Sequence, residues 1–445
     1  MAMDKLWQKT TNVTMNDLVE RFLSSDDVVF DQLLARFDVL GSLAHIKGLL
    51  DAEILTQQEY LVMQAGLRKI LQIAETDGIT VTSADEDIHT VVEAMLKSDI
   101  GDPADKLHTL RSRNDQIAVD IRLYCKQQLL DTMRQVLDLA AAFNELATKN
   151  ENVPMPGYSH MQKAMVSSVG LWAHSFSASL LDDCTSLISA YTLNDQSPLG
   201  SAAGYGSPLP LNREIAAKAL GFAAVQENAL YCQNSRGKTE LAIVHGILQI
   251  MHTINKFSAD TLLFTMSEFK YFSLPDNFLT GSSIMAQKKN YDVLEMLRAQ
   301  LAAVSSHFQH ITLLIGSLPS GYNRDFQEVK KPLFASFAVS NKSLAVTLEV
   351  VKALRPNKET LAAAITTDLL VTNEVYALVE QGVPFREAYR QIGAQYEKGE
   401  LIPQQTTALP LIDTTLLYQN LQNKNAFLAK EQAAYSKCLR LLSED

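Results

Sequence analysis

Apolar residues recur along positions 294–315 at alternating intervals of three and four. This heptad pattern is typical of a long helix whose apolar face packs against other helices. The same intervals recur at 243–257, and the flanks of that stretch remain apolar as far as Phe264. We therefore expect a second long helix that is buried on several sides. The first pattern consists of Leu294, Leu297, Leu301, Val304, Phe308, Ile311 and Ile315.

Helical patterns dominate the rest of the chain as well. Alternation of Val and Ile, which is typical of strands, is scarce outside "GITVTS" at 78–83. The sequence therefore predicts a mainly α protein. Further helices are expected near 114–149, 165–191 and 325–354. Loops rich in Gly, Pro, Ser and Asn separate them at 150–158, 196–210, 271–286 and 316–322.

Length and charge narrow the class of protein. A chain of 445 residues favours about three lobes, and a net charge of -11 argues against a nucleic-acid or anionic-membrane surface. The cysteines, Cys125, Cys184, Cys232 and Cys438, form no CxxC pair, which argues against a disulfide framework or a zinc site. The N-terminal "MAMDKLWQKTT" lacks the apolar core of a signal peptide. We expect a cytoplasmic protein that binds neither nucleic acid nor membrane.

Three short motifs do not support the sites that they suggest. "RGKT" at 236–239 resembles the end of a phosphate-binding loop, but Cys232 occupies the place of the required glycine. His307 and His310 have the spacing of two metal ligands, yet they lie within an apolar seam and no further ligand pair accompanies them. "GSAAGYGS" at 200–207 lacks the glycine order of a dinucleotide site.

Three polar segments are better candidates for chemistry. The segments 106–116, 157–164 and 281–290 each place hydrogen-bond donors just before a long helix. We expect Asn290 to cap the helix that carries the heptad pattern. A helix N-terminus beside two lysines would form an anion site, and the alternative is an exposed polar loop.

The same segments resemble motifs of the argininosuccinate lyase family, within the fumarase/aspartase superfamily. "GSSIMAQKKN" at 281–290 is similar to the superfamily pattern GSSxMPxKxN, and its ending QKKN favours the argininosuccinate branch. Residues 86–116, "GYSHMQKA" at 157–164, residues 197–214 and "LPSGYNRDFQEVK" at 318–330 extend the similarity over nearly the whole chain.

This resemblance implies a three-lobed, mainly α fold. It comprises an N-terminal helical lobe at 1–110, a central bundle of long helices at 111–355 and a C-terminal helical lobe at 356–445. The family assembles as a homotetramer through its central helices, and each active site takes segments from three subunits. The heptad pattern independently calls for helical partners.

The resemblance also implies the reaction, which is β-elimination of argininosuccinate to arginine and fumarate without a metal or organic cofactor. In this interpretation Ser282 is the base, and Lys288 and Asn290 donate hydrogen bonds to the carbanion. His160 matches the histidine assigned to acid/base work, and Glu295 matches the residue that pairs with it.

Other matched positions are expected to bind the substrate. Arg113 and Asn114 suit a carboxylate of the fumarate portion, because a guanidinium offers a planar pair of donors. The remaining expected binding residues are Ser159, Tyr322, Gln327, Lys330, Asp87 and His89.

The chain departs from the family pattern in a few places. Leu110 replaces a glycine, and a positive φ there would cost about 1–2 kcal/mol. Ala286 and Tyr291 replace prolines, and "KLWQKTT" at 5–11 replaces the usual Gly-Gly-Arg-Phe. The alternatives are another lyase of the superfamily that releases fumarate from a succinyl adduct, or a non-catalytic homologue similar to the δ-crystallins.

Overall fold

The computed structural model describes residues 16–24, 27–82, 85, 87–403, 409 and 414–444, and most of them are helical. The prediction of a mainly α fold is therefore confirmed. The predicted departure at 5–11 lies outside the described residues. No helix among the described residues is both long enough and apolar enough to cross a membrane.

The N-terminal helices pack into a lobe. α2 (Asp27–Asp51) packs against α3 (Gln57–Thr76) and α4 (Ile88–Ile100). α1 (Asp17–Ser24) precedes them, and η1 (Asp102–Lys106) follows. Residues 78–82, which carry most of the only strand-like alternation, form no strand.

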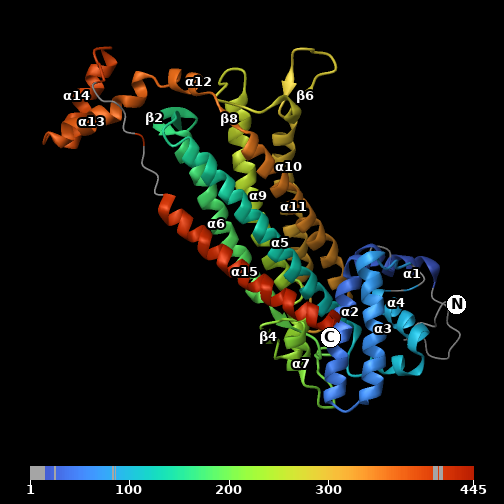
Figure 1. The fold of residues 1–445 in the computed structure, drawn as a ribbon. Coiled ribbons are helices and arrows are strands. Elements are labelled where there is room, and N and C mark those ends of the chain that lie inside the picture. The colour runs from blue at the N-terminus through green and yellow to red at the C-terminus, as the bar shows by residue number, and fades with distance from the viewer. Residues whose placement is uncertain are drawn as a thin grey trace.

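Five long helices form the central bundle. α5 packs against α6 and α11, and α9 packs against α6 and α10. Figure 1 shows these helices running side by side along the length of the molecule. Their bounds are α5 (Arg113–Lys149), α6 (Val169–Asn194), α9 (Lys238–Thr265), α10 (Asp292–Ile315) and α11 (Lys330–Ala353).

The heptad pattern lies where the sequence places it. Leu294, Leu297, Val304 and Ile311 are buried, and the intervening apolar positions of α10 are half-buried against the same core. The pattern at 243–257 is buried along α9. Each such buried side chain contributes about 1.5–3 kcal/mol of burial free energy, so both predicted helices are confirmed as core elements.

A β-hairpin between α5 and α6 was not predicted. β1 (Pro154–Ser159) pairs with β2 (Gln162–Ser168), so the helix expected near 165–191 begins only at Val169. His160 and Met161 form the turn, with φ of 54° and 61°. A two-residue turn of this kind usually contains Asn or Gly, and their absence hid the hairpin in the sequence.

Short elements join the long helices. β3 (Gln196–Ser197) pairs in parallel with β4 (Ala224–Val225), and β5 (Phe272–Ser273) pairs with β8 (Arg355–Pro356). β6 (Thr280–Gly281) pairs with β7 (Lys289–Asn290) and closes the loop between them. The short helices are α7 (Arg213–Ala219), α8 (Ala229–Asn234), η2 (Asp276–Phe278) and η3 (Arg324–Val329).

The C-terminal part divides into two. α12 (Lys358–Ala363), η4 (Thr367–Leu370), α13 (Val371–Glu380) and α14 (Phe385–Glu397) lie at one end of the bundle, where α13 and α14 share a small core of their own. α15 (Thr414–Glu444) instead returns along the bundle and joins the main core. The lobe boundaries 1–110, 111–355 and 356–445 stay a prediction.

The long helices separate two ends of the molecule. Figure 1 shows β2 and β6 at one end and the lobe of α2, α3 and α4 at the other. The 37 residues of α5 span about 55 Å at 1.5 Å per residue. The 24 residues of α10 span about 36 Å. Segments attached to opposite ends of these helices therefore lie far apart within one chain.

Candidate active site

A cavity of about 220 Å³ opens between the N-terminal lobe and the end of the bundle at which α5 and α11 begin. It brings together seven of the eight residues predicted to bind substrate, which come from three separate segments. These seven are Asp87, His89, Arg113, Asn114, Tyr322, Gln327 and Lys330. Leu23, Asp31, Ile117, Arg236 and Arg324 complete the wall.

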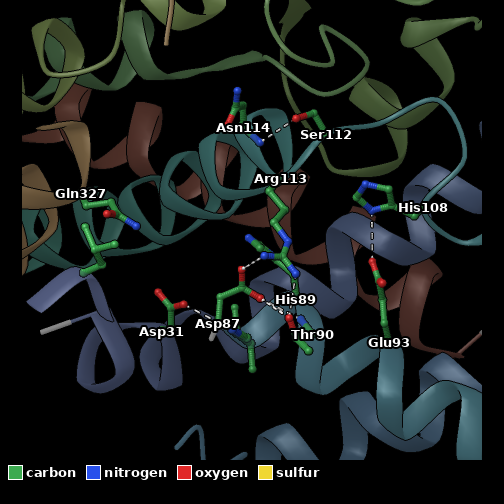
Figure 2. Close-up of polar contacts among 12 residues, drawn as sticks. Asp31, Asp87, His89, Thr90, Glu93, His108, Ser112, Arg113, Asn114 and Gln327 are labelled. Atoms are coloured by element: carbon green, nitrogen blue, oxygen red, sulfur yellow. Dashed lines mark hydrogen bonds and ion pairs between the residues drawn. The ribbon is translucent and has the colours of Figure 1, made fainter. Parts of the chain in front are cut away.

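Arg113 is held from below by the start of α4. Its guanidinium lies 3.1 Å from a carboxylate oxygen of Asp87 and donates a hydrogen bond of 2.9 Å to the Thr90 hydroxyl. Asp87 caps α4 by accepting a hydrogen bond from the Thr90 amide at 2.9 Å. Burial opposes ionisation of Asp87, but the charges of His89 and Arg113, together with two hydrogen bonds from Thr90, outweigh burial and keep the pKa of that carboxyl below its usual value. Figure 2 shows Arg113 pointing toward Asp87, His89 and Thr90.

Asn114 lies in the first turn of α5, and a capping box fixes that turn. Ser112 and Asp115 bond reciprocally to each other's backbone amides. The second carboxylate oxygen of Asp115 accepts hydrogen bonds from the amides of Gly200 and Ala202 at 2.8 and 2.9 Å. This buried carboxylate therefore joins the segment 197–214 to the helix turn that presents Asn114.

The opposite wall of the cavity is formed by η3 and the start of α11. Lys330 donates to Asp31 of α2 at 2.9 Å, and both side chains are almost completely buried. Arg324 donates a hydrogen bond of 2.9 Å to Gln327. The Arg236 guanidinium lies 5.3 Å from the centre of the Tyr322 ring, which is within cation–π range.

His89 lies at the rear of the cavity. Its Nδ1 lies 2.6 Å from Asp38, and both side chains are buried. Burial opposes a charge on this imidazole, but the charge and hydrogen bond of Asp38, together with the other carboxylates nearby, outweigh burial and raise the pKa of His89 to about 10. His89 therefore faces the cavity as a cation at neutral pH.

The segment that leads into α5 contains the predicted backbone strain. Leu110 has a φ of 63°, which confirms that this position requires a positive φ. Its neighbour Thr109 is held by His45, whose Nε2 lies 2.8 Å from the Thr109 carbonyl oxygen. Burial and the charge of Arg111 lower the pKa of His45 to about 3, so the ring is neutral and its N–H donates to that carbonyl.

Sequence reasoning missed three charged residues of the wall: Asp31, Arg236 and Arg324. Arg236 belongs to the "RGKT" motif, whose spacing excludes a phosphate loop, and Arg324 lies within the matched segment 318–330, in which only Tyr322, Gln327 and Lys330 are expected to bind. Asp31 had no local signal, because its role depends on Lys330, which is 299 positions away.

Ser159 and His160 lie apart from the cavity, at the tip of the β1–β2 hairpin. Both are exposed, and the Ser159 hydroxyl lies 2.8 Å from Nδ1 of His160. His160 has a positive φ, which is uncommon for a residue with a side chain and is found at functional turns. The turn presents its imidazole away from the core of its own chain.

The polar loop, residues 281–290, also lies at the hairpin end of the molecule (Figure 1). The Ser282 hydroxyl accepts hydrogen bonds from the amides of Ile284 and Met285 at 3.3 and 3.1 Å. The prediction that Asn290 caps α10 is wrong. Tyr291 is the residue before the helix, and the Asn290 amide instead donates to the Gly281 carbonyl across the β6–β7 pair. Strand pairing takes up the residue that would otherwise cap.

Lys288 and Glu295 are exposed at the same end. One chain therefore gathers the predicted binding residues at one end and the five predicted catalytic residues, with Ser159, at the other. The lengths of α5 and α10 keep these two groups from meeting within a single chain.

The charges of the cavity define the ligand class that it suits. Five cationic side chains and two carboxylates line it, and the two carboxylates are engaged by Arg113 and Lys330. The excess of positive charge favours an anion with more than one negative group, such as a dicarboxylate.

Comparison with known proteins gives consistent matches over most of the chain. The model of a lyase family matches residues 2–305. Argininosuccinate lyase of Parabacteroides distasonis is 38% identical over 399 residues, which cover 90% of this chain and 89% of that protein. Argininosuccinate lyase of Thermotoga neapolitana is 36% identical over 393 residues, which cover 88% of this chain and 98% of that protein.

Solved structures share the fold. EDDS lyase in complex with formate superposes with a TM-score of 0.79 at 22% identity, covering 97% of this chain and 95% of that one. Class II fumarase from Schistosoma mansoni superposes with a TM-score of 0.71 at 14% identity, covering 94% and 92%. These similarities in fold extend over nearly the whole chain.

Proposed function

This chain belongs to the argininosuccinate lyase family, and on that premise we propose that it cleaves argininosuccinate to arginine and fumarate in the cationic cavity. The reaction is a β-elimination, and its arginine product belongs to arginine biosynthesis. The observation that carries the proposal is that seven expected binding residues, distant in sequence, line one cavity with excess positive charge.

The catalytic roles that we propose follow from the chemistry of the elimination. A base removes a weakly acidic proton next to a carboxylate, and the resulting carbanion places extra negative charge on that carboxylate. Ser282 supplies the base, and Lys288 and Asn290 stabilise the developing charge by hydrogen bonding. His160 protonates the leaving guanidinium nitrogen, and Glu295 favours its charged form. Arg113 and Asn114 bind a carboxylate of the substrate.

We propose that the complete site forms between subunits of a homotetramer. Two observations support this. The cavity and the hairpin end are separated by about 55 Å along α5, and neither His160 nor Ser282 lines the cavity of its own chain. A neighbouring copy packed antiparallel along the bundle would bring its hairpin and polar loop to this cavity.

We keep two further expectations as proposals. The elimination needs no metal or organic cofactor, because the substrate's own carboxylate stabilises the carbanion. The cytoplasm is the proposed location, and it is supported by four cysteines that are all free thiols, three of them buried.

An absorbance assay for fumarate release tests the function. The purified protein is given argininosuccinate, adenylosuccinate, aspartate or malate in separate reactions, with and without a metal chelator. We expect fumarate from argininosuccinate only, at a rate that the chelator does not change. Release from another substrate would indicate a related lyase, and no release from any of them would indicate a non-catalytic homologue.

A further inference from the structure

Three buried side chains meet directly behind the cavity, and only one of them reaches its wall. Asp38 of α2, His89 of α4 and Asp120 of α5 are 2%, 3% and 1% exposed. A ring nitrogen of His89 and one oxygen of each carboxylate lie within 4.8 Å of one another. His89 lines the cavity, whereas Asp38 and Asp120 do not.

The contacts within this group are unequal. His89 Nδ1 lies 2.6 Å from Asp38 but 3.8 Å from Asp120, so its proton is engaged by Asp38. Both oxygens of Asp120 and the second oxygen of Asp38 have no hydrogen-bond partner among the described residues. Buried oxygens without a donor are rare in folded proteins and call for an explanation.

The neighbouring charged side chains bond to other groups, so none of them donates to the free oxygens of Asp38 and Asp120. Asp31 of α2 bonds to Lys330 of α11, and Asp87 bonds to Arg113. Arg111, from the segment before α5, donates to Ser42 and lies 3.9 Å from Glu93. Among the described residues, His89 is therefore the only cationic side chain within 4 Å of Asp38 or Asp120, and the more distant charge of Arg111 only partly offsets the burial of Asp120.

A second ionised carboxylate at this depth would be strongly unfavourable without a counter-charge, and such groups bind a proton instead. Burial, together with the charge of Asp38, raises the pKa of Asp120 well above its usual range. A proton on Asp120 would also supply the hydrogen that the free oxygen of Asp38 lacks.

We propose that Asp38 and Asp120 form an acid pair that carries one negative charge and one extra proton, held on Asp120, and that this pair positions His89 as an imidazolium at the cavity wall. The use of that imidazolium to bind a substrate carboxylate rests on the proposed function. Asp38 and Asp120 are positioning residues, since they act through His89.

Within the acid pair either carboxylate can take over the charge. If Asp38 is replaced by Asn, Asp120 stays buried but loses the repulsion of Asp38 and keeps the attraction of the His89 imidazolium, so we expect Asp120 to ionise. If Asp120 is replaced by Asn, Asp38 keeps the charge. His89 loses its counter-charge from the pair only when both are replaced, so the two substitutions are not additive.

Infrared spectroscopy of the full-length protein at pH 8 tests the location of the proton. We expect a carbonyl band of a protonated carboxyl in the wild type that Asp120→Asn lacks. The same comparison in an Asp38→Asn background should show no such band. Asp183→Asn is the matched control, because burial raises the pKa of Asp183 only to about 6 and its carboxyl is ionised at pH 8.

Two further measurements test the link to His89. The NMR signal of His89 in histidine-labelled protein, assigned by its loss in His89→Gln, should titrate within the neutral range only in the double variant Asp38→Asn/Asp120→Asn. The KM for argininosuccinate should rise about tenfold or more in the double variant, beyond the product of the two single effects, while kcat changes less.

Two results would overturn the acid pair. One is the absence of an Asp120 carboxyl band in the wild type. The other is a divalent cation, tested with Mn²⁺ and Zn²⁺, that raises the Tm of the wild type but not of Asp120→Asn, since a cation would then supply the missing charge. The infrared and NMR measurements need no turnover, so failure of the proposed function would leave them standing.

Discussion

The two ends of this molecule are built in opposite ways. At the cavity end, charged side chains are buried and paired, as in Lys330 with Asp31 and His89 with Asp38. At the hairpin end, His160 and Lys288 are exposed and Ser282 is half-buried, and all three lie in short turns or loops. The first end owes its geometry to the packed core, and the second owes it to local backbone turns.

In the proposed shared site, a single chain carries both halves of the reaction centre without completing it. A buried ion pair holds its shape because breaking it would leave an uncompensated charge. An exposed turn has no such restraint, and another copy of the chain would have to supply its surroundings. The contrast predicts that substitutions at the two ends will affect stability and turnover in different proportions.

The largest effect is expected for Ser282→Ala. Removal of the proposed base should lower kcat by about 10²–10⁴-fold and leave substrate binding largely intact, because the anion donors remain. Ser283→Ala is the matched control and should retain more activity. Steady-state kinetics and a binding titration measure both effects. Near-normal turnover in Ser282→Ala with loss of turnover in Ser283→Ala would contradict the assignment of Ser282 as the base.

A large gain is expected when two inactive variants are mixed. If each site takes Ser282 and His160 from different subunits, denatured Ser282→Ala and His160→Asn chains that refold together should regenerate some intact sites. Partial activity in the mixture, absent from each variant refolded alone, is the expected result. A stable and active monomer, measured by light scattering, would contradict the shared site.

The contrast in stability is tested with two lysines. Lys330→Met leaves Asp31 buried and unpaired, which should cost about 3–5 kcal/mol of unfolding free energy. Lys288→Met removes an exposed side chain and should change stability by less than about 0.5 kcal/mol, while turnover falls. Urea unfolding and the fumarate assay report the two quantities. Equal destabilisation by both would remove the distinction between the ends.

The smallest effect concerns Leu110. Leu110→Gly removes the strain of the positive φ, about 1–2 kcal/mol, but adds about 0.5–1 kcal/mol of glycine entropy and loses half-buried surface. We expect a net change of less than about 1 kcal/mol. Leu110→Val should be more destabilising, because a β-branched residue fits this backbone conformation poorly. Thermal unfolding of the two variants decides the order.

Periodic burial made the long helices predictable from the sequence. The apolar spacing in α9 and α10 follows from the regular 3.6-residue helical turn, so it is visible in short stretches of the sequence. The β1–β2 hairpin has no such period, and its turn of His160 and Met161 lacks the usual turn residues. The Asn290 cap was mispredicted for a related reason, since strand pairing across nine residues overrode a local preference.

The site was predictable only as far as motifs reach. Resemblance selected Arg113, Asn114 and Lys330, and the structure places all three around one cavity. The supporting residues Asp31, Asp38 and Asp120 were not predicted, because their roles depend on tertiary neighbours rather than on adjacent positions in the sequence. Motifs identify the groups that face a ligand, and packing alone reveals those that hold them.

The continuous helix α5 makes the spacing of the enzyme's parts a matter of residue count. Insertion of one residue within it would rotate everything beyond by about 100° and advance it by 1.5 Å. A whole heptad would restore the rotation approximately but lengthen the molecule by about 10.5 Å. The 37 residues of α5 thus fix the distance between the two ends of the molecule. A change in the length of this helix would have to be matched by the helices beside it for the two ends to stay in register in the proposed homotetramer.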